Sequence, residues 1–191
     1  MPRKQTASPP SGVTSLLYPL DRFYAEAGRP LPSFGAIRGE EMPKLYRDLL
    51  AHRNDMTPTL EAWHGASLHL EVLSRQVKDG VLARQVLLLT DGGNLPVEYG
   101  AIEIRLERFP EAARPAILEC RKPLGAILRD RRIPHSGRPS YFFRLTGDAY
   151  ITRVLGLSGA PTLYGRHNTL LDDRGEPLAE IVEILPLLPA K

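Results

Sequence analysis

The stretch Val81-Leu-Ala-Arg84-Gln-Val-Leu-Leu-Leu89 decides the fold, because it is rich in β-forming apolar residues and carries one charge. Side chains of a strand alternate between two faces, so Arg84 shares its face with Leu82, Val86 and Leu88. A buried guanidinium is costly without a partner, and its planar fork suits a carboxylate. The pattern therefore predicts a buried cavity in which Arg84 meets an acid of the protein or of a ligand.

The flanking segments extend this strand into an antiparallel sheet. Residues 68–77 alternate before a Lys78-Asp79-Gly80 turn, and residues 97–106 form a third strand after a turn at 91–94. Three strands joined by tight turns indicate a meander. In the third strand, apolar Ile102, Ile104 and Leu106 are expected to face inward, with Glu103 and Arg105 facing outward.

Helical patterns surround the meander, and further strands follow it. The expected helices cover residues 16–27, 42–50, 55–63, 111–120 and 124–132. The expected later strands cover residues 142–145, 150–157, 161–171 and 178–185, with residues 138–140 in a loop. This order predicts an α+β protein with helices over one face of an antiparallel sheet.

The length of 191 residues and the ordinary composition predict one domain over residues 13–191, preceded by a disordered tail at 1–12. The tail lacks an apolar signal core, and no apolar run approaches the length of a bilayer span. The net charge of +3, without a basic aromatic stripe, argues against a nucleic-acid partner. The single cysteine, Cys120, excludes an internal disulfide and fits a reducing compartment, so we expect a cytoplasmic protein.

Two glutamates in the last strand are candidates for a buried acid. Glu183 shares a face with Ala179, Ile181 and Leu185, and Glu180 lies on the other face, which is also apolar. A buried carboxyl near Arg84 could keep a raised proton affinity and act as a general acid. The alternative, which periodicity alone favours, is that one glutamate is exposed and the other pairs structurally with an arginine.

Two further motifs carry charge. Tyr164-Gly165-Arg166-His167 places two basic groups on a strand, either at an exposed edge or in a site. Lys122-Pro123-Leu124-Gly125 starts a helix whose free N–H groups could face an anion, although a simple helix start is the favoured interpretation. The five histidines show no metal-ligand spacing, and no phosphate-loop or dinucleotide-binding pattern occurs, so we expect neither metal nor cofactor.

In their order along residues 55–186, these segments resemble the chorismate lyase family. The similar segments are Asp55-Met56-Thr57, the Arg84 strand with its Asp91-Gly92 turn, Lys122-Pro123-Leu124-Gly125, Leu163-Tyr164-Gly165-Arg166-His167, and Gly175-Glu176-Pro177-Leu178 with Glu183 and Leu185-Pro186. The resemblance implies a six-stranded antiparallel sheet covered by helices around an internal ligand cavity. It also implies that chorismate is split into 4-hydroxybenzoate, a ubiquinone-type precursor, and pyruvate, without metal or cofactor.

The resemblance assigns roles to several residues. Arg84 would bind the ring carboxylate with help from the backbone N–H of Leu124, Met56 and Gly125 would line the pocket, and Glu183 would lie near the ring oxygen as the acid. Glu180, Arg166 and Arg75 are further candidates. The second arginine of some family members falls near Gly100 or Ala101, and residues 13–54 match no motif, so a related enolpyruvyl or aromatic acid is an alternative substrate.

The expected reaction needs few protein groups, because loss of the enolpyruvyl group aromatises the ring. The protein must bind an acid, exclude water and supply a proton, and a dry cavity would also release its flat product slowly. The competing prediction is a non-catalytic sensor or carrier of an aromatic acid, since effector domains of some transcription regulators share this fold. The roughly fifty residues before the matching segments lack the recognition-helix pattern expected of such a regulator.

Overall fold

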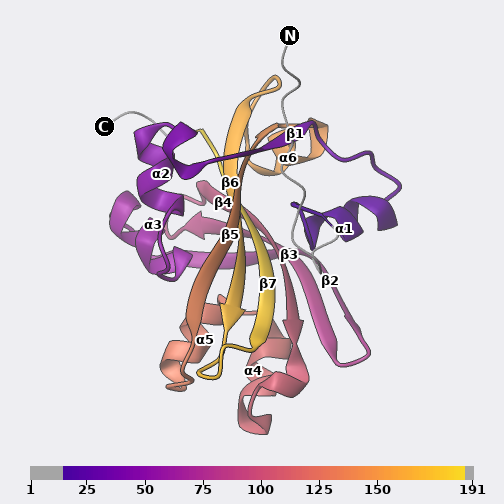
Figure 1. Cartoon of the computed structure of the whole chain (residues 1–191), viewed down its shortest axis with the longest axis vertical. Helices are drawn as coiled ribbons and strands as arrows, with labels where there is room; N and C mark the ends of the chain where they lie inside the picture. Colours follow the sequence, from indigo (N-terminus) through magenta and orange to yellow (C-terminus); the bar gives the residue numbers. More distant parts are fainter. Residues whose placement is uncertain (1–14, 188–191) are drawn as a thin grey trace.

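One antiparallel sheet of seven strands runs through the computed structural model, which describes residues 15–187 (Figure 1). The strand order is β1-β5-β6-β7-β4-β3-β2. The strands are β1 (Phe34–Ile37), β2 (Leu68–Lys78), β3 (Val81–Thr90), β4 (Pro96–Arg105), β5 (Ser136–Thr146), β6 (Thr162–Leu171) and β7 (Pro177–Leu185). The α+β class is confirmed, with one strand more than the six expected.

The predicted meander is present as β2, β3 and β4. The β2–β3 hairpin turns at Asp79 and Gly80, whose φ angles of 50° and 76° are both in the left-handed region. This backbone is the one that a two-residue hairpin loop requires. The turn fixes the register that sets Arg84 opposite Arg75 on β2, and the separate pairing of β3 with β4 sets Arg84 opposite Ile102.

Short helices cover both faces of the sheet, whereas the sequence predicted helices on one face. The helices are α1 (Leu20–Glu26), α2 (Lys44–Leu50), α3 (Met56–His64), α4 (Arg114–Glu119), α5 (Leu124–Asp130) and α6 (Ala149–Val154), with 3-10 turns η1 (Gly39–Glu41), η2 (Leu106–Arg108) and η3 (Glu111–Ala113). α1 and α6 pack on one sheet face, and α2 to α5 pack on the other. Glu103, expected to face outward, is therefore buried beneath α1, where Arg22 forms an ion pair with it.

Three local predictions were wrong. Residues 150–157 do not form a strand, because Asp148 accepts a hydrogen bond from the Ile151 N–H at 2.8 Å and caps α6. Residues 138–140 do not form a loop but lie within β5, where the register shifts between Pro139 and Tyr141. The edge strand β1, which pairs with β5, was not predicted at all.

The predicted tail at residues 1–12 lies outside the described residues, so the domain boundary at residue 13 stays a prediction. Within residues 15–187, no helix has the length and apolar character needed to cross a membrane.

Candidate functional site

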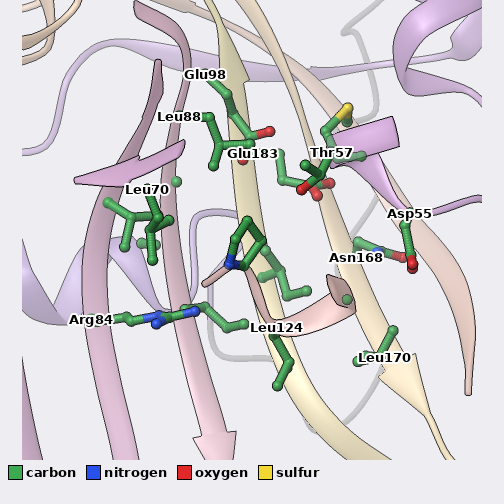
Figure 2. A pocket seen from close by; sticks show the side chains of 18 residues that line it. Asp55, Thr57, Leu70, Arg84, Leu88, Glu98, Leu124, Asn168, Leu170 and Glu183 are labelled. Carbon is green, nitrogen blue, oxygen red and sulfur yellow. The ribbon is translucent and has the colours of Figure 1, made fainter. Parts of the chain in front are cut away.

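A buried pocket lies between the sheet and the helices α3 and α5 (Figure 2). Strands β2, β3, β4, β6 and β7 supply its sheet side, and the first residues of α3 and α5 supply the other. The lining is mostly apolar, with a few charged and polar side chains among it. The pocket brings together Met56, Arg84, Leu124, Gly125 and Glu183, the residues that the family resemblance assigns to the site.

Arg84 has the buried charge that the alternation of β3 predicted. Its side chain is 2% exposed, and its Nη2 donates to the Lys122 carbonyl at 3.4 Å. Nε and Nη1 are buried without a partner among the described residues. Burial lowers the pKa of the guanidinium, and the neighbouring Cys120 side chain offsets part of this shift.

Glu183 also lines the pocket, but it is not the partner of Arg84 that the sequence predicted. Nε of Arg166 on β6 donates to Oε2 of Glu183, which lies opposite it in the register of β6 and β7. The structural interpretation is therefore confirmed for the pairing of Glu183 with an arginine, whereas Glu180, expected on an exposed face, is half-buried. Glu183 still faces the cavity, where it can accept a further hydrogen bond.

Arg166 is buried and holds Glu183 in position, so it is not an exposed edge residue. Its side chain is 1% exposed, and its Nη1 donates to the carbonyls of Leu50 at 3.0 Å and His52 at 2.9 Å. These contacts join β6 to the end of α2. Arg166 does not line the pocket, so it acts on a ligand only through Glu183.

Glu180 and Arg75 lie outside the pocket. Glu180 accepts a hydrogen bond from Thr169 at 2.8 Å on the opposite face of the sheet, and burial raises its pKa. Arg75 is exposed, and its Nη1 donates to the Leu118 carbonyl at 3.0 Å. The one-residue ambiguity in the last strand is thereby resolved in favour of Glu183.

Glu98 was missed in the sequence, although it lines the pocket. It is 5% exposed, and its Oε2 has no hydrogen-bond partner among the described residues. Burial raises the pKa of this carboxyl well above its usual range, and the charge of Glu183 raises it further, while Arg166 lowers it. The alternation of side chains along β4 could have identified Glu98, because it lies on the same face of the strand as Ile102 and Ile104.

Asp55 forms the rim of the pocket where α3 meets α5. Arg129 donates to its Oδ2 at 2.5 Å, and Nε2 of His135 lies 3.2 Å from its Oδ1. The hydrogen bond with His135 lowers the pKa of Asp55 and raises that of His135. A Cβ atom at Gly125 would lie 2.8 Å from Oδ2 of Asp55, so glycine allows this close approach of the two helices.

No group of three or more His, Cys, Asp or Glu side chains in residues 15–187 is arranged to hold a metal ion. The pocket offers instead a guanidinium at one end and two carboxyl groups at the other. Figure 2 shows Arg84 on the opposite side of the pocket from Glu98 and Glu183. A small acid with a second polar group fits this arrangement of charge.

Comparison with solved structures places this architecture among known folds. PhnF from Mycobacterium smegmatis is 15% identical with a TM-score of 0.52, over 72% of this chain and 69% of that chain. The effector domain of the same PhnF gives 15% identity and a TM-score of 0.52, over 71% of this chain and 95% of that domain. The chain has the UTRA and chorismate lyase-like fold.

At this identity the likeness concerns the UTRA and chorismate lyase-like fold alone. No protein-family model matches the chain, and no curated protein matches it. The residues of the pocket therefore carry any argument about function.

Proposed function

We propose that this protein is a cytoplasmic chorismate lyase, which splits chorismate into 4-hydroxybenzoate and pyruvate without a cofactor. The observation that carries the proposal is Arg84, which lines the pocket and has two buried guanidinium nitrogens without a hydrogen-bond partner among the described residues. A carboxylate is the group that satisfies such a fork. The ring carboxylate of the substrate would supply it, and the enolpyruvyl side of the ring would lie toward Glu183.

The reaction requires only that the protein orient the substrate and transfer protons. The bond between the ring and the ether oxygen breaks, and its electron pair leaves with the enolpyruvate. The neighbouring ring carbon loses a proton, and the pair left behind completes the aromatic ring. The enolpyruvate takes up one proton and becomes pyruvate, so the overall proton count is unchanged. A pocket that excludes water favours this elimination over side reactions.

A second candidate is a binding module that recognises an aromatic acid and does not react with it. The likeness in fold to the effector domain of PhnF favours this candidate. Both candidates use Arg84 to hold a carboxylate, so a binding measurement alone does not distinguish them. Conversion of chorismate to products distinguishes the lyase from the binding module.

The test is to incubate the purified chain with chorismate and measure 4-hydroxybenzoate and pyruvate together. We expect equal amounts of both products from the wild-type protein, none from Arg84→Ala, and wild-type rates from Arg75→Ala, whose arginine is exposed and outside the pocket. Binding of 4-hydroxybenzoate without turnover would favour the binding module. A folded wild-type protein that neither binds 4-hydroxybenzoate nor converts chorismate would overturn both candidates.

A further inference from the structure

Glu98 lines the pocket together with Glu183, while Asp55 lies at its rim, and the proposed elimination assigns no role to Glu98. It lies on β4 four residues from Ile102, which pairs with Arg84, so its Cα is about 13 Å along the strand from the level of the Arg84 Cα. Glu183 pairs with Gly100, midway between these two levels. Figure 2 shows the side chains of Glu98 and Glu183 on the side of the pocket away from Arg84.

The position of the Glu98 carboxyl depends on Gly100. A Cβ atom at Gly100 would lie 3.1 Å from Oε1 of Glu98 and 3.4 Å from Cγ2 of Val86. The Glu98 side chain therefore bends back over its own strand toward the level of Glu183. Its Oε2 is buried without a hydrogen-bond partner among the described residues, and the Glu98 side chain lines the pocket.

The two carboxyl groups differ in their surroundings. Glu183 is held by Arg166 as a buried ion pair. Glu98 has no such cation, and the charged groups that act on it are Glu183 from β7 and Arg166 from β6, which is already paired. Two neighbouring carboxyls in a dry site do not both ionise readily, and the one without the cation keeps its proton. Such a separation of protonation states gives one acid and one base.

We infer that Glu98, and not Glu183 as the family resemblance implies, is the catalytic acid that protonates the departing enolpyruvyl group, while Glu183 accepts the proton lost by the ring. This inference rests on the proposed lyase function. In the step, the proton of Glu98 goes to the enolpyruvate, and the ring proton goes to the Glu183 carboxylate. One proton then passes from Glu183 to Glu98 and restores both groups, so the cycle balances without any further reactant.

The test compares Glu98→Gln with Glu180→Gln. The first removes the proton and keeps the shape and a hydrogen-bond donor. The second is a matched change in a partly buried glutamate on the opposite face of the sheet, outside the pocket. For each variant, kcat and KM for chorismate are measured across pH, together with the affinity for 4-hydroxybenzoate.

We expect Glu98→Gln to bind 4-hydroxybenzoate within about threefold of the wild type while its kcat falls on the order of 10²- to 10⁴-fold, the range of a general acid. The wild-type kcat should decline on the alkaline side, where Glu98 loses its proton, and Glu98→Gln should lack this decline. Glu180→Gln should keep wild-type values. If Glu98→Gln does not fold, Glu98→Met removes the carboxyl without adding an amide and serves in the same comparison.

Retention of more than about a third of the wild-type kcat in Glu98→Gln would overturn the role of Glu98 and leave the lyase function standing. An equal loss of kcat and of 4-hydroxybenzoate affinity would also overturn it, because Glu98 would then act in binding. A wild-type protein that converts no chorismate would overturn the lyase function, and this role of Glu98 with it.

Discussion

Arg84 holds a charge inside the protein, where its Nη2 donates one long hydrogen bond to the Lys122 carbonyl. A buried charge that lacks a counter-ion lowers the free energy of unfolding. Such a residue is retained for what it binds, because an apolar side chain of similar size would pack in the same volume at lower cost. Stability and ligand binding are therefore expected to change in opposite directions at this residue.

Arg84→Met tests this opposition. We expect the ligand-free variant to gain on the order of 1 kcal/mol in the free energy of unfolding, measured by urea denaturation, because the unpaired charge is removed. The same variant should lose the rise in Tm that 4-hydroxybenzoate gives the wild-type protein. Arg75→Met, at an exposed arginine, should alter the free energy of unfolding by less than about 0.5 kcal/mol and keep the rise. A loss of more than about 1 kcal/mol in Arg84→Met would mean that Arg84 stabilises the fold.

The residues of the pocket were predictable in part. Alternation in β3 identified Arg84, and the ordered family segments identified Met56, Leu124 and Glu183, all of which line one pocket. The partner of Glu183 was not predictable from periodicity, because the pairing with Arg166 depends on which strands are neighbours. The inward face of β4 was assigned from its isoleucines alone, so Glu98, near the start of the same strand, was missed.

At the scale of elements, the long strands were predictable and the short elements were not. β3 and β7 have enough apolar residues for their sequences to indicate strands. β1 has only the four residues Phe34-Gly-Ala-Ile37, and it forms a strand because it can pair with the edge of β5. The segment of α6 is rich in β-forming residues, yet the cap at Asp148 and the packing of Ile151 against the sheet make it helical. Tertiary contacts outweigh local propensity in both cases.

Gly165 on β6 fixes the approach of two neighbouring strands. A Cβ atom there would lie 2.5 Å from the Glu183 carbonyl oxygen and 2.5 Å from Cζ of Phe143. Because a backbone carbonyl in the middle of a sheet cannot move aside, Gly165→Ala should lower the free energy of unfolding by about 3 kcal/mol or more.

Gly35 on the edge strand β1 is the matched control for this substitution. Apart from its chain neighbours, no heavy atom of residues 15–187 lies within 4 Å of a Cβ atom placed there, so Gly35→Ala should be neutral or slightly stabilising, by up to about 1 kcal/mol. Chemical denaturation of both variants measures the difference. Equal effects at the two glycines would contradict the close packing of β6 against β5 and β7.

At the scale of the whole molecule, the sheet is covered on both faces, and the pocket lies under the helical layer of one of them. Asp55 at the start of α3 is tied to Arg129 of α5 and to His135 beyond it. These contacts hold the start of α3 against α5 at the rim of the pocket, so we expect the release of a ligand to need a movement of α3, α5 or both. Such movements set the turnover rate in many enzymes with closed sites.

The proposed lyase should therefore release 4-hydroxybenzoate more slowly than it forms it. When chorismate is mixed in excess with the protein and quenched at short times, we expect a rapid burst of about one 4-hydroxybenzoate per molecule, followed by a slower steady rate. That steady rate should equal the dissociation rate of 4-hydroxybenzoate, measured separately by displacement. Product formation that is linear from the first sample would show that the chemical step is slow. Dissociation of 4-hydroxybenzoate much faster than turnover would show the same, and opening of the rim would then not limit the cycle.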